Sequence, residues 1–265
     1  MHKKIRLNAA ATAGLLIILF FLIIAVFAPV IAPYDPKEMI ASYLPPSKEH
    51  ILGTNDVGQD IFSEMVYGTR VSLYIGIFAA FIVTGVGTVL ALVSGYFGGV
   101  ADKIITAITN IAMAVPSLPL TVLLIAYLNP GKWSLIIAIS ITAWTGTARI
   151  LRARVMQLKE LPFIKIEKTM GVHPAVILFK HILPNIKDII LTRGAMAISG
   201  AMMTEAGLSF LGLGEFGEKS WGSVLHYAFF RNSIMKKQYW WYVPPIVCIC
   251  VCVLGFMLIG YYGKI

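Results

Sequence analysis

Residues 71–94 read VSLYIGIFAAFIVTGVGTVLALVS, and this run contains no charged side chain. A helix needs about 20 mostly apolar residues to cross the hydrocarbon core of a membrane. It must also satisfy its own backbone polar groups there, because lipid offers them no partner. The run therefore predicts a helix that crosses a membrane, and further membrane helices are expected wherever the chain has similar apolar runs.

Further apolar stretches lie on both sides of this run, separated by polar or turn-rich segments. Of the 265 residues, 58% are hydrophobic and 13% are charged, about half of the ~25% typical of soluble domains. The first stretch exceeds the ~7–15 apolar residues of a signal peptide, so we expect it to be retained. The pattern predicts an all-α integral membrane protein with six transmembrane helices, at about residues 13–31, 71–94, 104–128, 133–148, 189–204 and 243–260.

The charges are distributed unevenly along the chain. Residues 149–193 contain nine basic and three acidic side chains, whereas residues 34–70 contain six acidic and three basic ones. Basic loops stay on the cytoplasmic side of a membrane. We therefore expect both termini and the 149–193 loop inside, with basic Lys3, Lys4, Arg6 and Lys264 near the termini. The net charge of +9 does not indicate nucleic-acid binding, because no basic stripe carries interleaved aromatic residues.

The 149–193 loop contains the pattern of a helical hairpin. Pro162 suits the first turn of a helix, Gly171 suits a left-handed helix end, and a second helix is expected from Pro174 to Pro184. Such a hairpin exposes apolar residues at the cytoplasmic face. This surface either binds a partner protein or lies on the lipid surface as an amphipathic pair, and physical reasoning alone leaves both alternatives open.

Residues 163–171, FIKIEKTMG, and residues 181–184, HILP, resemble the coupling-loop signature of binding-protein-dependent ABC importers. The family pattern is Glu-Ala-Ala, three residues, Gly, nine residues, Ile-x-Leu-Pro. The family's glutamate falls on Lys165, its alanines on Ile166 and Glu167, and its isoleucine on His181. The resemblance implies that the hairpin couples to ATPase subunits through Phe163, Lys165, Glu167, Gly171, Val172, His173, Pro174, His181, Leu183 and Pro184.

Four other segments narrow the resemblance: residues 50–60 (HILGTNDVGQD), 67–73 (YGTRVSL), 205–214 (EAGLSFLGLG) and 220–222 (SWG). They look like the C-type permease subunits of dipeptide, oligopeptide and nickel importers, although the family usually has Gly-Thr-Asp and Gly-Arg-Asp where this chain has Gly-Thr-Asn and Gly-Gln-Asp. The resemblance implies a type I importer permease fold in the plasma or inner membrane of a prokaryote. Residues 1–70 would form the first helix and an external segment, and residues 71–262 the transmembrane core.

The same resemblance implies the partners and the cargo. The chain would form a translocation pathway with a homologous B-type permease, together with two ATP-binding subunits and an external substrate-binding protein. Di- and oligopeptides are the leading cargo, with nickel chelates or oligosaccharides as alternatives. Because the chain lacks a Walker-type phosphate loop, we expect it to bind no cofactor, with Mg-ATP held by the partner ATPases.

Some residues are candidates for the translocation pathway: Pro116, Met202, Met203 and Glu205. An ionisable residue within a membrane span is a functional candidate, but Glu205 also suits a helix-end carboxylate at the start of a polar outer segment, residues 205–238. No catalytic residue is predicted, because the sequence lacks Gly-x-Ser-x-Gly and His-Glu-x-x-His; an intramembrane enzyme is the remote alternative. No metal site is predicted either, since no two histidines have the spacing that places ligands on one helix face.

Overall fold

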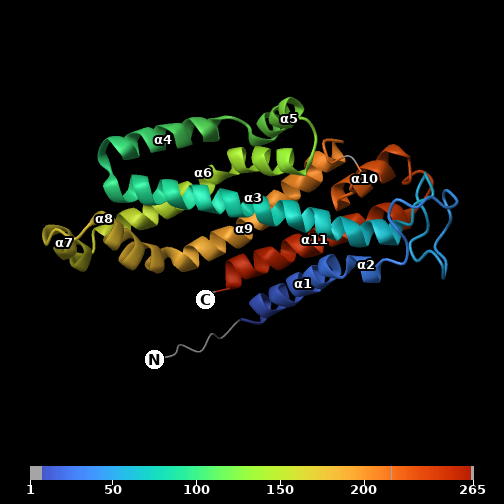
Figure 1. The fold of residues 1–265 in the computed structure, drawn as a ribbon, viewed down its shortest axis with the longest axis horizontal. Coiled ribbons are helices and arrows are strands. Elements are labelled where there is room, and N and C mark those ends of the chain that lie inside the picture. The colour runs from blue at the N-terminus through green and yellow to red at the C-terminus, as the bar shows by residue number, and fades with distance from the viewer. Residues whose placement is uncertain (1–7, 216, 264–265) are drawn as a thin grey trace.

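The structure is a computed structural model that describes residues 8–215 and 217–263, and within these ranges it is helical with no strand (Figure 1). This confirms the predicted all-α class. The elements are α1 (Ala9–Val26), α2 (Ala28–Ile31), α3 (Ile61–Phe97), α4 (Gly99–Ala114), α5 (Ser117–Leu128), α6 (Lys132–Lys159), α7 (Pro162–Thr169), α8 (Pro174–Val176), the π-helical turn η1 (Ile177–Ile182), α9 (Leu183–Phe210), α10 (Trp221–Phe230) and α11 (Tyr239–Tyr262).

Helix α3 runs through the middle of the molecule, α6 and α9 run along it, and α11 packs against α1 and α9 (Figure 1). With 37 residues it is about 55 Å long, well beyond the ~30 Å hydrocarbon core of a membrane. At least one end of α3 therefore projects past the hydrocarbon core. The helix begins after Asp60, whose side chain accepts a hydrogen bond from the Ser63 backbone N–H, and it continues through residue 70 without a break. The expected boundary between residues 70 and 71 thus lies inside a helix.

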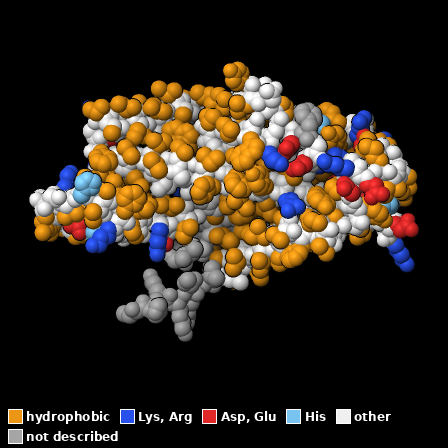
Figure 2. Space-filling model, viewed as in Figure 1, with side chains coloured by type: hydrophobic (Ala, Val, Ile, Leu, Met, Phe, Trp, Pro, Cys, Tyr) orange, Lys and Arg blue, Asp and Glu red, His pale blue; other side chains and the backbone are white. Residues whose placement is uncertain are grey.

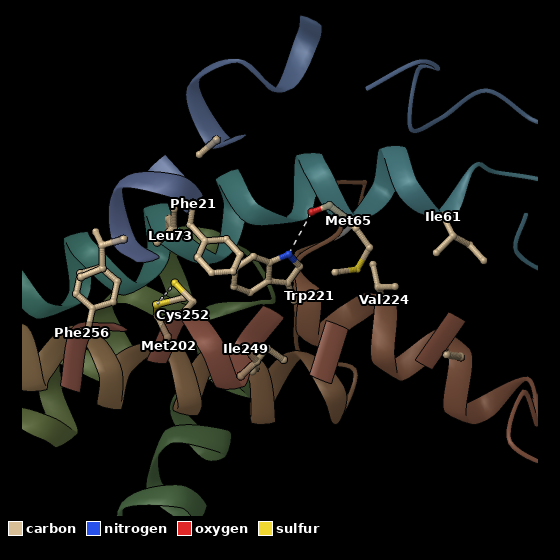
Figure 3. Close-up of a cluster of buried hydrophobic side chains, with 14 of the residues drawn as sticks. Phe21, Ile61, Met65, Leu73, Met202, Trp221, Val224, Ile249, Cys252 and Phe256 are labelled. Carbon is tan, nitrogen blue, oxygen red and sulfur yellow. Dashed lines mark hydrogen bonds between the residues drawn. The ribbon is translucent and has the colours of Figure 1, made fainter. Parts of the chain in front are cut away.

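A cluster of buried apolar side chains joins α1, α3, α9, α10 and α11 (Figure 3). Trp221 lies at its centre and is fully buried. Its indole N–H donates a hydrogen bond of 3.1 Å to the Met65 carbonyl oxygen, and its ring meets the Phe21 ring edge-on at 5.3 Å. One tryptophan therefore ties the short helix α10 to the first and third helices.

The expected third span, residues 104–128, is not one straight helix. It is divided into α4 and α5, which are bent by 90° relative to each other. The break falls at Val115, whose backbone is extended, and Pro116, which precedes the first residue of α5. A residue before proline is driven out of helical geometry by contact with the proline ring, and proline itself donates no backbone hydrogen bond. The predicted segment is therefore not a straight helix, and α4 and α5 form either one broken span or a re-entrant loop.

The expected fifth span, residues 189–204, is part of a longer element. The second helix of the hairpin does not end at Pro184, because α8, η1 and α9 form one continuous helical path from Pro174 to Phe210. The wider turn of η1 makes this possible: the Leu183 N–H bonds five residues back, to Leu178, and so accommodates the following proline. As a result, Glu205 lies inside a helix and not in a polar outer segment.

Four described helices, α1, α3, α6 and α11, are long and apolar enough to cross a membrane, and the bent pair α4 and α5 makes up to five. Helix α9 is long enough, but it carries Lys187, Asp188, Arg193 and Glu205 and is not in this set. The count of six spans therefore stays a prediction. Apolar side chains cover the middle of the molecule, while charged groups gather toward its two ends, as suits a membrane protein (Figure 2).

The hairpin lies at one end of the long axis, and the segment between α2 and α3 lies at the other (Figure 1). The basic residues expected at the chain termini, Lys3, Lys4, Arg6 and Lys264, lie outside the described residues. We predict that the hairpin end faces the cytoplasm. In a variant with Cys248, Cys250 and Cys252 replaced by alanine, Gln157→Cys should resist a membrane-impermeant thiol reagent in intact cells, whereas Glu49→Cys should react. Labelling of Gln157→Cys in intact cells would reverse the orientation.

Candidate coupling surface and translocation cavity

A tight reversal of the chain separates the two arms of the hairpin. Helix α7 starts at Pro162, in the first turn, where the missing N–H costs nothing. It ends at Thr169, and Gly171 follows two residues later with φ +75°, a left-handed conformation that glycine adopts without steric cost. The Gly171 N–H bonds to Lys168 O at 3.2 Å and the Val172 N–H to Glu167 O at 3.1 Å. This pair of bonds is the Schellman arrangement, and it confirms Gly171 as the helix stop.

The second arm begins with a side-chain cap. His173 Nδ1 accepts a hydrogen bond of 3.3 Å from the Ala175 N–H, and Pro174 follows as the first residue of α8. Farther along, Asn185 Nδ2 donates to the His181 carbonyl oxygen at 2.6 Å, next to Pro184 in the first turn of α9. These contacts hold the arm in helical geometry up to the membrane-directed helix.

The inner side of the hairpin is anchored to the ends of α3 and α6. Ile164, Ile177 and Ile182 are buried, and they join a cluster with Leu92 and Leu151. Val172 and Leu183 pack against the same cluster and are partly buried. The hairpin is therefore packed directly against two helices that are apolar enough to cross a membrane.

The outer side of the hairpin is apolar and open to solvent. Five large apolar side chains there have exposed fractions of 44% to 75%; we call them the tip surface, and they are Phe163, Ile166, Met170, Val176 and Phe179. Contiguous exposed apolar groups at the end of a protein mark a surface that binds a partner or a membrane. The predicted exposure of apolar residues on the hairpin is confirmed.

Two ion pairs within the chain involve residues of the hairpin. Lys165 Nζ lies 2.8 Å from Glu160 Oε2, and both side chains are more than half exposed. This contact lowers the pKa of Glu160, first through the hydrogen bond from Lys165. His181 Nε2 lies 2.9 Å from Glu167 Oε1. Two departures from the family pattern, Glu167 and His181, therefore face each other, which sequence spacing did not indicate.

A cavity of about 660 Å³ lies beside the break between α4 and α5. Pro116 and Met203 both line it, although they are 87 positions apart in the chain. The polar part of its lining is made of hydroxyl groups, and the lining includes no charged side chain: the hydroxyl residues are Ser117, Thr121, Thr142, Thr145 and Thr204. We call this space the hydroxyl-lined cavity. A neutral lining of this kind can hydrogen-bond polar groups without selecting for charge.

Met202 and Glu205 do not line this cavity. Met202 is buried against Cys252, in the cluster around Trp221. Glu205 is 1% exposed; Ser72 Oγ donates to its Oε2 at 3.1 Å, and Ser209 Oγ to its Oε1 at 2.7 Å. The backbone N–H of Trp221 also donates to Ser72 Oγ, at 3.3 Å. Glu205 thus connects α3, α9 and the start of α10, and the serines it uses lie inside the recognised motifs at 67–73 and 205–214.

The histidines have local structural partners. His50 Nδ1 lies 2.9 Å from Asp60 Oδ1, and His226 Nδ1 lies 2.7 Å from the Phe210 carbonyl oxygen. In residues 8–215 and 217–263, no group of three or more His, Cys, Asp or Glu side chains is arranged to hold a metal ion.

Comparison with known families and proteins gives a consistent result. A family model described as "Binding-protein-dependent transport system inner membrane component" matches residues 87–262, and one described as "N-terminal TM domain of oligopeptide transport permease C" matches residues 1–46. The oligopeptide transport system permease protein OppC of Bacillus subtilis is 37% identical over 262 residues, covering 97% of this chain and 84% of that protein.

Two further relatives and a solved structure agree with this. The dipeptide permease DppC of Bacillus subtilis is 33% identical, covering 97% of this chain and 81% of its own. The glutathione permease GsiD of Pectobacterium atrosepticum is 35% identical, and the match covers 98% of this chain and 86% of that protein. In structure, the inward-facing MetNI methionine ABC transporter matches with a TM-score of 0.61 at 18% identity, covering 76% of this chain and 94% of that one.

Proposed function

The chain belongs to the family of binding-protein-dependent transport system inner membrane components, and from this premise we propose that its cargo is a short peptide. It is an integral inner-membrane protein and a permease subunit of an ABC importer. Such a subunit works with a partner permease, ATPase subunits and a binding protein. Its relatives include oligopeptide, dipeptide and glutathione permeases, which favours peptides over nickel chelates or oligosaccharides.

The hydroxyl-lined cavity supports peptide cargo. Peptides differ in side-chain charge but share a backbone of amide donors and acceptors. Serine and threonine hydroxyls both donate and accept hydrogen bonds, so they can exchange partners along such a backbone. We infer that the cavity, with Pro116 and Met203 in its wall, is this subunit's share of the translocation pathway.

The tip surface supports coupling to an ATPase. It is apolar, lies at the end of the molecule, and stands on a hairpin whose inner side is packed against α3 and α6. We infer that the partner ATPases hydrolyse Mg-ATP and move this hairpin, and that α3 and α6 carry the motion into the membrane. A rigid element with one exposed apolar face is suited to transmit displacement between two packed arrangements.

Uptake measurements test the cargo. The chain should be produced with its partner permease, ATPases and binding protein in a bacterium that lacks its own peptide importers. We expect ATP-dependent uptake of radiolabelled trialanine, and none when the partner ATPases lack their catalytic residues. Uptake of a nickel chelate or maltotriose in place of trialanine would overturn the peptide proposal while leaving the importer intact.

A charge reversal at Lys165 tests the coupling contact. We expect Lys165→Glu to lower co-purification of the ATPase by less than about fivefold, because exposed ion pairs contribute little. Added salt should reduce the difference, since screening acts within about 10 Å. The control is Lys165→Gln, which removes the charge without placing a second carboxylate beside Glu160. If only Lys165→Glu lowers the amount of co-purified ATPase, the effect comes from repulsion between the new carboxylate and Glu160. If Lys165→Glu recovers as much ATPase as the wild type, or more, Lys165 does not contact the ATPase.

A further inference from the structure

A second cavity, of about 890 Å³, lies at the end of the molecule opposite the hairpin. It is enclosed by the segment after α2, the first half of α3, the loop before α10, and α10 itself. Its volume falls within the range of small-molecule binding sites, about 300–1,000 Å³. Unlike the hydroxyl-lined cavity, it is lined by four acidic and four basic side chains. We call it the charged cavity.

One carboxylate in its wall is buried and incompletely satisfied. Glu64 is 1% exposed, and its Oε1 accepts hydrogen bonds from the Lys219 ammonium and from Asn55 Nδ2, the latter at 2.9 Å. Its Oε2 has no hydrogen-bond partner in the described part of the chain. A buried carboxyl oxygen without a hydrogen-bond partner is costly, so a ligand group that donated a hydrogen bond to it would be bound favourably.

A cation of the chain itself currently satisfies the other oxygen. Lys219 belongs to the loop before α10, and its ammonium also donates to Gln59 Oε1 at 2.6 Å and lies 4.8 Å from the centre of the Tyr227 ring. An ammonium group held by a carboxylate, an amide oxygen and an aromatic face is in a complete cation site. The amino end of a ligand could take the same place only by displacing Lys219.

The charged cavity also presents an uncommitted cation. Arg70 lines it, six residues after Glu64 on α3, and within residues 8–215 and 217–263 it forms no ion pair. Of the lysines that line the cavity, Lys132 is paired with Glu215 and Glu218 and Lys219 with Glu64, whereas Lys37 also forms no ion pair among the described residues. A guanidinium group binds carboxylates through two parallel hydrogen bonds. The cavity therefore offers a buried carboxylate, whose cation position Lys219 now occupies, and an unpaired guanidinium that can receive an anion.

We propose that the charged cavity binds a zwitterion, namely the free ends of a short peptide, with Glu64 receiving the amino group and Arg70 the carboxylate. Lys219 occupies the position of the amino group when no cargo is present. This proposal rests on peptide cargo as the function, and it adds a recognition site within the permease itself, separate from any selection by the binding protein.

Photo-crosslinking tests the site on the assembled transporter in nanodiscs, without its binding protein. The probe is the tripeptide Ala-Bpa-Ala, in which Bpa is p-benzoylphenylalanine and both ends are free. We expect adducts on residues that line the charged cavity, such as Tyr67 and Tyr74. Trialanine should compete with the probe. N-acetyl-trialanine and trialanine amide should need a roughly tenfold higher concentration to compete equally well, as expected for loss of one hydrogen bond to a charged group.

Two variants separate the two ends of the ligand. In Glu64→Gln, trialanine and N-acetyl-trialanine should compete equally, while the amide remains weaker. In Arg70→Gln, trialanine and its amide should compete equally, while the acetylated peptide remains weaker. Glu49→Gln and Lys48→Gln, at exposed positions outside the cavity, are the matched controls and should keep the wild-type order. If both site variants also keep that order, or if the adducts lie elsewhere, the proposal is wrong.

The variant Lys219→Met should strengthen competition by trialanine instead of weakening it, and this test does not require that Glu64→Gln folds. Without its internal competitor, Glu64 should bind a free amino group more tightly, so trialanine should compete at roughly tenfold lower concentration. N-acetyl-trialanine should be unchanged, and weaker competition by trialanine would overturn the role given to Lys219. If the wild type takes up peptide but capped and free peptides compete equally for the probe, this site alone is refuted. Absence of both uptake and adducts would refute peptide cargo as well.

Discussion

Replacing Gly171 by valine should abolish most transport-linked ATP hydrolysis. The binding protein should still associate with the external side of the transporter. Gly171 has φ +75°, and a left-handed conformation costs an ordinary residue about 1–2 kcal/mol and a β-branched residue more. A Cβ added at this position meets no atom within 4 Å, so the effect comes from the backbone and not from a clash. We expect at least about a tenfold loss of stimulated ATPase activity, because the reversal that presents the tip surface is lost.

The control is Gly171→Asn, because asparagine adopts left-handed geometry more readily than other residues with a side chain. It should retain most of the activity. Binding-protein association, measured by pull-down, should be equal for the wild type and both variants. If Gly171→Val transports at the wild-type rate, the hairpin is not the coupling element. If it loses binding-protein association as well, the substitution has damaged the whole fold.

Replacing Trp221 by alanine should cause the largest loss of stability. Trp221 is fully buried at the junction of α1, α3 and α10, and truncating a buried tryptophan to alanine typically costs about 3–5 kcal/mol. The change also leaves the Met65 carbonyl oxygen without the indole N–H that it accepts from (Figure 3). We expect a clearly lower midpoint of thermal denaturation for the purified transporter, and lower yield in membranes.

Two variants help to interpret that result. Trp133→Ala makes the same chemical change at a side chain that is 54% exposed, and it should alter the midpoint little. Trp221→Phe keeps most of the packing and removes the hydrogen bond, which is worth about 1 kcal/mol. Equal midpoints for Trp221→Ala and Trp133→Ala would contradict the central position given to Trp221.

The sequence determined the features that depend on local chemistry. Long uncharged runs such as residues 71–94 predicted membrane helices, because lipid cannot satisfy an open backbone. Pro162 and Gly171 predicted where α7 begins and ends, because each residue has a restricted or special backbone geometry. The motifs at 163–184 and 205–222 were sufficient to recognise the family, which the comparisons confirm.

Helix boundaries were less accurate wherever packing overrides local preference. Pro184 was expected to end a helix, but η1 absorbs it and the helix continues to Phe210. Pro116, in contrast, bends the chain by 90°. Both prolines lack the same N–H, and the difference lies in the neighbouring turn, which is wide at η1 and extended at Val115. Sequence pattern alone does not distinguish these outcomes.

Contacts between distant residues were decided only by the tertiary structure. Pro116 and Met203 share a cavity, Glu167 pairs with His181, Glu205 receives hydrogen bonds from Ser72 and Ser209, and Glu64 meets Lys219. The sequence supplied each of these residue types, but a side chain's partner depends on how α3, α9 and the loop before α10 are packed together. Burial also decides the energetic cost of such groups, because a carboxylate such as Glu64 costs free energy only where water cannot reach it.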